Sequence, residues 1–414
     1  MMVSCCDAPG LMPIEQALEK IQQVMVPVTE TEMVPVHMLA GRIMAEDVIS
    51  LIDVPGYDNS AMDGYALRHA DLASVTVFTQ IGKSFAGSPF DGRVEAGQCV
   101  RIMTGAQIPE GADAVVMQEN VHDDNGQISL LTSVKLGEAI RRRGEDIGKG
   151  QVVLSKGRRI SPVDIGLLTS VGISEVRVFR QITVALFSTG DELRQPGETL
   201  PNGCIYDSNR PALYALLNEM GAKVLDLGVV EDNPDSIRDA FLRADKEADV
   251  VITSGGVSVG EADFTRDILE ELGEIDFWKL AMKPGKPLAF GRLPNSYFFG
   301  LPGNPVSAMV TFHQIALPNL LRLGGNEPAP RFRIQARATA PFKKRPGRTD
   351  FQRGIWERDD QNGLQVSPLS NQSSGVLSSI SQANCYIVLE QERGSVEAGE
   401  MVTIEPFDSY LKAN

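Results

Sequence analysis

The sequence predicts a multidomain α/β protein built around a doubly wound α/β domain with β-rich modules on both sides. The first observation is length, because 414 residues are too many for one hydrophobic core. The second is a regular alternation of strand-like and helix-like segments between residues 181 and 326. The third is a series of short β-branched runs at residues 49–146, and again at residues 330–411.

The chain opens on a small linking domain of helical and extended character, expected at residues 11–48 and 147–180. Helical spacing of apolar residues predicts its first helix, through Ile14, Ala17, Leu18, Ile21 and Val24. A second helix is expected to begin at Ser161 and Pro162, because Ser is a preferred N-cap and Pro suits the first helical position. Between these pieces, VTVFTQI, CVRIMTG, DAVVMQENV and QISLLTSV predict an inserted β-rich domain at residues 49–146.

The central domain, residues 181–326, alternates strands with helices. ITVALFSTG, KVLDLGVV and ADVVITS are predicted strands, whereas SNRPALYALLNEMG, DNPDSIRDAFLRADKEA and FTRDILEELG are predicted helices. The helical pattern NPVSAMVTFHQIALPNLLRLGG closes the domain and NEPAP is a linker. Beyond it, RFRIQARATA, TDFQRGIWERD, LQVSPLS, NCYIVLEQ and MVTIEPF predict a C-terminal all-β, barrel-like domain at residues 330–411.

Composition excludes several function classes. The formal net charge of −15 argues against a general affinity for nucleic acid or anionic membranes. Five scattered cysteines, none in a C-x-x-C pair, do not form a disulfide framework, and four histidines argue against a histidine-rich zinc centre. The N-terminus has no signal-peptide pattern and no apolar run approaches the ~20 residues of a membrane span, so we expect a cytoplasmic protein.

Three loops in the central domain point to an anion site. They are SGGVSVGEAD (with Ser254, Gly255, Gly256 and Ser258), KLAMKPGKP (with Lys279, Lys283, Lys286 and Pro287) and GLPGNPVSA (with Pro302, Pro305 and Ser307). Loops at the carboxyl ends of parallel strands gather where ligands bind. Glycines let the backbone approach an anion closely, and prolines stiffen a loop that carries ammonium groups. The competing interpretations are a ligand-free turn, a solvated lysine loop and a structural helix cap.

Acidic residues follow three successive strands. Glu192 lies in STGDEL, Asp232 in VVEDNPDS and Asp263 in the glycine-rich loop. Carboxylates at strand ends can hold Mg²⁺, so the three residues are candidate metal ligands. Either of the first two alone is more often a helix N-cap, and Asp232 before Asn-Pro has that pattern.

Eight motifs in unbroken order resemble the MoeA family, the molybdopterin molybdenumtransferases. They are DVPGYDNSAMDGYA, RIMTGAQIPEGADAVVMQE, RRRGEDI, LFSTGDEL, IYDSNR, ITSGGVSVGEADF, MKPGKP and GLPGNPVSA. The resemblance covers about residues 11–410 and extends to the E domain of gephyrin. It implies a molybdopterin-binding α/β domain and an enzyme that transfers molybdenum from molybdate to the dithiolene of adenylylated molybdopterin, releasing AMP, with a divalent cation (Mg²⁺) as cofactor.

The resemblance also assigns roles. It implies catalytic roles for Asp63, Thr104, Glu192, Asp232 and Asp263, the first two reaching the active cleft from the second subunit of a homodimer. Lys283, Lys286 and Pro287 would form the molybdate pocket, and Lys279 would lie near the pterin or its phosphate. Ser307 would also face the anion, and Pro302 and Pro305 are further substrate-binding candidates. Arg353 of DFQRG and Ser374 of NQSSG would close over molybdate. Arg141 and Asp146 of RRRGEDI are matched too, and this arginine run either clamps phosphate or joins modules through ion pairs.

Two alternatives come from the same pathway or family. One is that the chain is itself an adenylyltransferase that uses ATP, and the other is that it is a non-catalytic dimeric scaffold of the gephyrin type. In the leading interpretation, the chain is expected to make transient contact with a separate molybdopterin adenylyltransferase. A third, from composition, is an RNA-binding C-terminal domain, because residues 331–353 are rich in Arg and Lys. The role of the Cys5-Cys6 tail and the recipient molybdoenzymes stay open.

Overall fold

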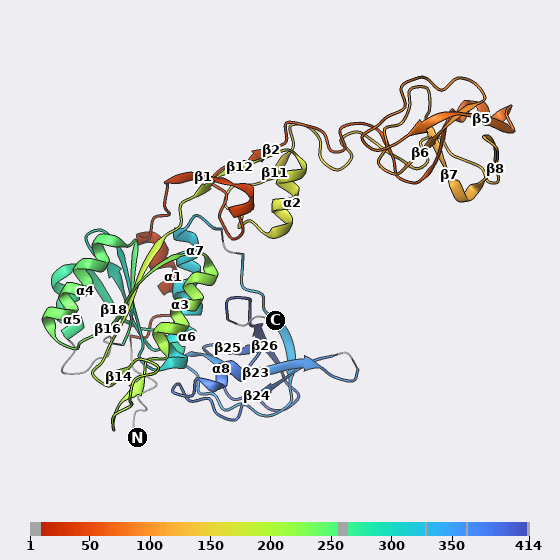
Figure 1. Ribbon diagram of the computed structural model, residues 1–414. Helices are drawn as coiled ribbons and strands as arrows, with labels where there is room; N and C mark the ends of the chain where they lie inside the picture. Colours follow the sequence, from red (N-terminus) through yellow and green to blue (C-terminus); the bar gives the residue numbers. More distant parts are fainter. Residues whose placement is uncertain (1–9, 256–263, 328, 362, 412–414) are drawn as a thin grey trace. The chain divides into compact units, whose positions relative to one another are not determined.

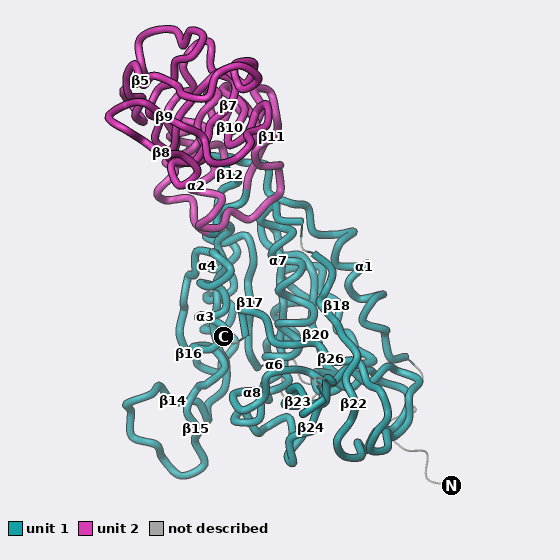
Figure 2. Tube along the Cα trace, turned by 90° about the vertical axis from the view of Figure 1, so that its right-hand side faces the viewer, with its two compact units in different colours: residues 1–32, 41–43, 178–414 teal, residues 33–40, 44–177 magenta. Residues whose placement is uncertain are grey.

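The computed structural model describes residues 10–255, 264–327, 329–361 and 363–411. The described chain divides into two compact units, one of residues 1–32, 41–43 and 178–414 and one of residues 33–40 and 44–177 (Figure 2). The division of the chain into four domains stays a prediction. Within the described residues, no helix combines the length and the apolar character that crossing a membrane requires.

The first unit contains the predicted α/β domain, built on a six-stranded sheet (Figure 1). In spatial order its strands are β16 (Lys223–Val230), β13 (Thr183–Thr189), β17 (Val250–Ser254), β21 (Tyr297–Leu301), β20 (Pro287–Arg292) and β18 (Glu274–Lys279). The first four are parallel, but β20 is antiparallel to both of its neighbours. The sheet is therefore mixed, with a hairpin where the sequence suggested only parallel strands.

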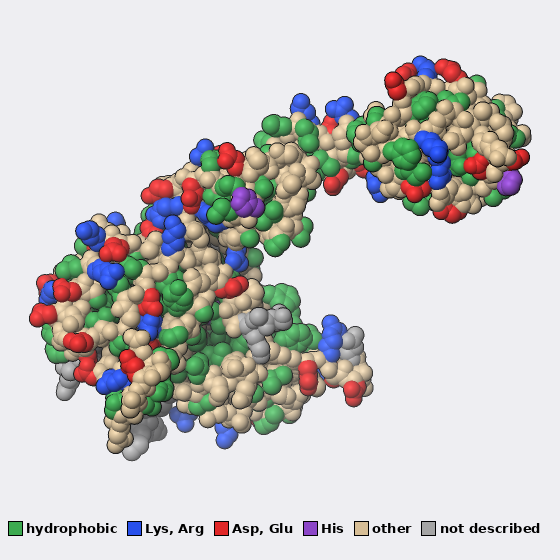
Figure 3. Space-filling model, in the orientation of Figure 1, with side chains coloured by type: hydrophobic (Ala, Val, Ile, Leu, Met, Phe, Trp, Pro, Cys, Tyr) green, Lys and Arg blue, Asp and Glu red, His purple; other side chains and the backbone are tan. Residues whose placement is uncertain are grey.

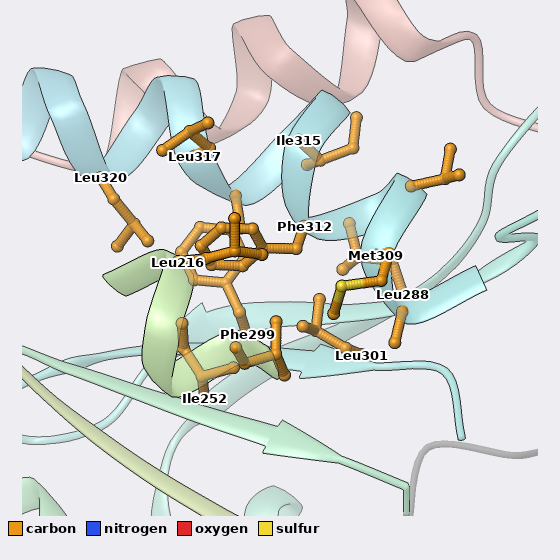
Figure 4. Packing of buried hydrophobic residues seen from close by; sticks show 14 of the residues in the cluster. Leu216, Ile252, Leu288, Phe299, Leu301, Met309, Phe312, Ile315, Leu317 and Leu320 are labelled. Carbon is orange, nitrogen blue, oxygen red and sulfur yellow. The ribbon is translucent and has the colours of Figure 1, made fainter. Parts of the chain in front are cut away.

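Helices cover both faces of this sheet. They are α1 (Ile14–Val24), α3 (Asn209–Met220), α4 (Pro234–Glu247), α5 (Phe264–Leu272) and α6 (Pro305–Thr311), which continues through the π-turn η4 (Phe312–Ala316) into α7 (Leu317–Leu323). In β13, Leu186 packs with α1, α3 and α6–α7, whereas Phe187 packs with α4 and α5. This alternation follows from strand geometry, in which successive side chains point to opposite faces. In Figure 4, Phe299 from the sheet meets Phe312 and Leu320 of the closing helix.

Helix boundaries in this unit follow local signals in the sequence. Gly221 ends α3 with φ +91°, the left-handed conformation that glycine adopts without steric cost. Asn233 is the N-cap of α4, because its side-chain oxygen accepts the Ser236 amide at 2.9 Å. The interpretation of Asp232 as that cap is therefore wrong, and its carboxylate is available for another role.

The C-terminal part of the first unit is a closed five-stranded barrel, as the sequence predicts. Its strands are β22 (Ile334–Ala338), β23 (Thr349–Arg358), β24 (Leu364–Pro368), β25 (Cys385–Leu389) and β26 (Met401–Pro406), with a short helix α8 (Ser378–Gln382). The ring closes because β23 pairs with both β24 and β25. A two-residue strand, β19 (Met282–Lys283), adds to β23 in parallel register. The α/β domain thus donates a piece of its lysine loop to the barrel sheet.

The second unit contains the inserted β-rich domain. Its six-stranded sheet has the order β7 (Ala114–Met117), β4 (Gly64–Leu67), β6 (Gln98–Ile102), β5 (Val77–Ser84), β9 (Gln127–Leu130) and β8 (Val121–Asp124). Smaller elements are η1 (Val36–Met38), β2 (Val48–Ile49) paired with β11 (Val152–Leu154), β3 (Asn59–Ser60) paired with β10 (Ile140–Arg141), η2 (His69–Ala73), η3 (Gln118–Asn120) and α2 (Pro162–Ser170). A two-stranded sheet of β1 (Thr31–Pro35) and β12 (Glu175–Phe179) lies where the chain passes between the units. In the first unit, β14 (Leu193–Arg194) and β15 (Ile205–Tyr206) form a short ladder.

The predicted start of α2 is confirmed as a capping box. The Ser161 hydroxyl accepts the Asp164 amide, and the Asp164 carboxylate accepts the Ser161 amide at 2.9 Å. Two otherwise unpaired backbone donors are satisfied in this way. Arg158 adds an ion pair to the same carboxylate at 2.7 Å.

Candidate active site

The predicted anion loops lie at one edge of the α/β sheet. Ser254 at the end of β17 is in register with Ser188 of β13 and with Leu301 at the end of β21. Lys279 at the end of β18 is in register with Pro287 at the start of β20. Because β18 and β21 both run antiparallel to β20, the lysine loop emerges at the same edge as the loops after β13, β17 and β21.

One side chain that the sequence did not single out joins two of these loops. The Asn209 amide, at the start of α3, donates to the Ser254 hydroxyl at 2.7 Å and to the Gly303 carbonyl at 2.8 Å. Gly255 has φ +97°, and a Cβ there would lie 3.0 Å from the Thr189 carbonyl oxygen. Close packing of the loops after β13, β17 and β21 therefore requires glycine at position 255 and an amide at position 209. The signal for Asn209 was present in the IYDSNR motif, but the residue type alone suggested no role.

Three predicted residues of this edge, Gly256, Ser258 and Asp263, lie outside the described residues. The phosphate cradle predicted from SGGVSVGEAD is thus described only as far as Gly255. Those assignments stay predictions.

The lysine loop is held by both the sheet and the barrel. The Leu280 amide donates to the Lys286 carbonyl at 2.7 Å, which closes the loop, and the Thr349 amide of the barrel donates to the Ala281 carbonyl at 2.9 Å. The Lys283 ammonium lies 3.0 Å from the Asp350 carboxylate, and their side chains are 45% and 5% exposed. Across the described chain, no ion pair is recorded for Lys279, which is exposed, or Lys286, which is half-buried. These two ammonium groups are available to an anion.

The loop conformation depends on Gly285, which lies between the two prolines. Its φ is +104°, and a Cβ there would lie 2.4 Å from the Thr311 hydroxyl and 2.6 Å from the Met282 methyl group. No other residue fits this position without displacement of a neighbour.

The barrel approaches the same edge through the NQSSG loop. The Val306 amide of α6 donates to the Ser374 carbonyl at 3.0 Å, which places Ser374 beside Pro305 and the buried Ser307. Pro302, at the end of β21, is buried. The predicted site residues Ser307 and Ser374 therefore lie in neighbouring segments.

Arg353 is not exposed to this edge. Its side chain is among the fully buried ones, at 1% exposure. The guanidinium donates to the Ser379 hydroxyl at 3.1 Å and to the carbonyls of Phe351 and Ser373, each at 3.3 Å. Burial lowers the pKa of Arg353. In this arrangement the guanidinium holds the loop that carries Ser374, and a direct contact with molybdate stays a prediction.

Carboxylates gather near the ends of β13 and β16. The pKa of Asp232 is raised, first by partial burial and then by the negative charges of Asp191 and Glu192. Both of those residues are exposed in the loop after β13. Among the described residues no group of three or more His, Cys, Asp or Glu side chains is arranged to hold a metal ion, and the predicted third acid, Asp263, is not described.

In the second unit, the structure brings together Asp63 and Thr104. One Asp63 carboxylate oxygen accepts both the Thr104 amide and the Thr104 hydroxyl, each at 2.7 Å. These hydrogen bonds hold the pKa of Asp63 below its usual value. The exposed carboxylate is therefore ionised and fixed in one orientation at neutral pH.

Two residues of the arginine run of RRRGEDI form ion pairs within the second unit. Arg142 pairs with Asp58 at 2.7 Å and Arg143 with Asp53 at 2.6 Å, so these two residues join segments of the second unit. Arg141 and Asp146 are exposed, and no ion pair is recorded for either within the described part of the chain. A role of Arg141 in phosphate binding stays a prediction.

Two of the basic residues of the barrel are neutralised by a buried acid. Arg331 and Arg333 both pair with the buried Glu405, each at 3.0 Å. On the face shown in Figure 3, acidic and basic side chains also interleave over α4 and α5. These observations do not favour an RNA-binding surface.

Three protein-family models match the chain in order. They are the MoeA N-terminal region (domains I and II) at residues 12–172, a probable molybdopterin binding domain at residues 185–322, and the MoeA C-terminal region (domain IV) at residues 335–407.

Curated proteins and solved structures match over nearly the whole length. A molybdopterin molybdenumtransferase of Haemophilus influenzae is 49% identical over 405 residues, which cover 97% of this chain and 100% of that protein. One from Bacillus subtilis is 36% identical, covering 91% and 89%. Gephyrin of Dictyostelium discoideum is 32% identical over 95% of this chain and 62% of its own length. A crystal structure of a molybdopterin biosynthesis MoeA protein from Pyrococcus horikoshii is 34% identical, with a TM-score of 0.79 over 96% of this chain and 100% of that chain.

Proposed function

Because the chain belongs to the MoeA family of molybdopterin molybdenumtransferases, we propose that it inserts molybdenum from molybdate into adenylylated molybdopterin and releases AMP. The product is the molybdenum cofactor. The observation that carries this proposal is the meeting, at one sheet edge, of the lysine loop with the loops after β13, β17 and β21. Both substrates are anions, and the lysine loop brings positive charge to this edge in a chain of net charge −15.

The lysine loop would position the two anions against each other. Lys279 and Lys286 have no carboxylate partner in the described residues, so their charge is free to attract phosphate or molybdate oxygens. Their ammonium groups are compact charges that suit an oxyanion. Lys283 would exchange Asp350 for an anion when one arrives. Since no protein nucleophile is required, most of the rate enhancement would come from positioning and electrostatic stabilisation.

The carboxylates near the ends of β13 and β16 are of the kind that binds a divalent cation. The pKa of Asp232 is raised by partial burial and then by the negative charges of Asp191 and Glu192, so the three carboxylates lie near one another. Oxygen ligands of this kind are those that Mg²⁺ prefers, and one or two suffice. Glu192 and Asp232 would hold the ion, with Asp263 as a third candidate. When bound, the ion withdraws negative charge from the phosphoanhydride oxygens.

Asp63 and Thr104 would serve a second subunit. We propose a homodimer in which this pair faces the sheet edge of the partner, as the resemblance implies. An ionised carboxylate fixed by two hydrogen bonds from Thr104 suits the role of orienting a substrate donor group. The second oxygen of Asp63 has no recorded partner among the described residues and is open to such a contact.

The test uses purified protein, adenylylated molybdopterin and molybdate, without ATP. Cofactor is measured by activation of an apo-molybdoenzyme, and AMP by chromatography. We expect turnover by the wild type and a loss of at least 100-fold in kcat/KM for Lys286→Ala and Asp63→Asn, by analogy with single electrostatic contacts in other enzymes, which contribute about 10²–10³.

The matched control is Lys223→Ala. Lys223 is an exposed lysine at the start of β16, at the opposite edge of the same sheet, and its loss should leave turnover unchanged. Turnover that requires ATP would identify an adenylyltransferase instead. Wild-type rates in both site variants would refute the site.

A further inference from the structure

A second cluster of cations lies in the barrel and shares only Lys283 with the site described above. It lines a pocket of about 450 Å³, formed by Lys283, Lys343, Lys344, Arg345, Pro346, Arg348, Asp350 and Ser395. Five of these residues are basic and one is acidic. All of them belong to the first unit.

The loop that carries these cations has a fixed conformation. Lys344 is buried, and its ammonium donates to the carbonyls of Arg345, Gln391 and Arg393 at 3.4, 3.2 and 2.7 Å. The Gly347 amide donates to the Gln391 carbonyl at 2.8 Å. The three ammonium donors of Lys344 are therefore used to shape the loop. Lys343, Arg345 and Arg348 remain at its surface.

The surface cations of this loop are not neutralised by carboxylates. Within the described residues, no ion pair is recorded for Lys343, Arg345 or Arg348. The acid in the pocket, Asp350, is buried and already bound by the Lys283 ammonium at 3.0 Å and the Gln352 amide at 3.2 Å. Glu390 and Glu392 lie near Lys344, and Glu390 also pairs with Arg393 at 3.8 Å. Like charges around one cavity repel one another, and a bound anion would relieve this repulsion.

The pocket is continuous with the lysine loop. Lys283 and Asp350 are partners in the β19–β23 ladder, and Lys283 lines the pocket while belonging to the loop that ends at Pro287. We propose that this pocket is an outer binding site for a small dianionic oxyanion, which receives molybdate before it passes to Lys286. This proposal rests on the proposed function and adds an entry site to it.

The experiment measures molybdate binding by titration calorimetry in the absence of pterin. The variant is Lys343→Gln/Arg345→Gln/Arg348→Gln, whose positions are exposed or half-buried, so that folding is expected to survive and is checked by thermal unfolding. We expect at least a tenfold increase in Kd for molybdate and a similar rise in the apparent KM for molybdate, with the KM for adenylylated molybdopterin unaffected. The single variant Arg348→Lys keeps the charge and should keep most of the affinity.

The matched control is Lys20→Gln/Lys223→Gln/Lys246→Gln, which removes the same charge from exposed positions outside the pocket. Equal affinity in both triple variants would overturn the proposal. Binding without any turnover by the wild type would leave the pocket standing and remove the proposed function. Inorganic phosphate distinguishes the source of the anion: weak competition indicates free molybdate, whereas equal competition indicates that the phosphate of the substrate is also accepted.

Discussion

Substitution of Gly285 by alanine should separate the shape of the lysine loop from its charge. The residue has φ +104°, and a Cβ there would lie 2.4 Å from the Thr311 hydroxyl and 2.6 Å from the Met282 methyl group. A positive φ costs an L-residue about 1–2 kcal/mol. Overpacking against two fully buried neighbours costs about 1–3 kcal/mol more. The expected loss is about 2–5 kcal/mol, unless the loop moves to relieve it.

The assay combines urea unfolding with turnover of adenylylated molybdopterin and molybdate. Gly399→Ala is the control, because Gly399 has φ +91° with no heavy atom within 4 Å of the added Cβ. It should lose only the conformational contribution of about 1–2 kcal/mol and remain active. Gly285→Ala should be less stable than this control, or equally stable with a displaced loop and a strongly reduced kcat/KM. Equal stability together with unchanged turnover would refute the reasoning.

Three further predictions concern hydrogen bonds and burial at particular side chains. Asn209→Ala removes an amide that donates to two loops, so it should cost about 1–2 kcal/mol in unfolding free energy and lower kcat/KM roughly tenfold; unchanged turnover would mean that the loops hold without it. Burial acts to raise the pKa of Asp164, but hydrogen bonds from Ser161 and Arg158 outweigh it, so the pKa lies below its ordinary value of 3.8. The carboxylate therefore stabilises the folded state at pH values above about 4. Asp164→Ala should therefore lower the free energy of unfolding by about 0.5–2 kcal/mol between pH 8 and pH 5. The difference between wild type and variant should narrow below about pH 4, and a difference independent of pH would mean that the charge of the carboxylate is not involved. Burial raises the pKa of Cys99 and Cys385 to about 12, so their thiols should react slowly. In a variant with Cys5 and Cys6 replaced by serine, a thiol reagent should label the half-buried Cys204 first. Rapid labelling of Cys99 or Cys385 would contradict their burial.

Local signals in the sequence predicted most of the elements. The Ser161–Asp164 capping box and the Gly221 helix stop depend on residues within four positions of each other, so residue type and spacing suffice to predict them. The five β-branched runs after residue 330 all became barrel strands. The antiparallel β20 was missed because a buried strand has the same apolar pattern in either direction.

The candidate site was predictable in its composition but not in its contacts. The lysine loop and the acidic residues after β13 and β16 could be predicted from residue type alone. Pairing of Lys283 with Asp350 spans 67 positions, and the hydrogen bond from Asn209 to Gly303 spans 94, so neither has a local signal. Arg353 shows the converse, since an arginine in a motif suggests an anion ligand, whereas its partners are carbonyls and a hydroxyl. The N-cap of α4 is Asn233 and not Asp232, a distinction that adjacent residues of similar capping preference do not reveal.

The addition of β19 to the barrel sheet has a consequence for redesign. Two residues of the lysine loop, Met282 and Lys283, are paired into a sheet whose other strands lie between Ile334 and Pro406. A graft of the α/β domain alone would leave this ladder without its partner, and the lysines would lose their alignment. Attempts to change which metal oxyanion the enzyme accepts should therefore vary both segments together.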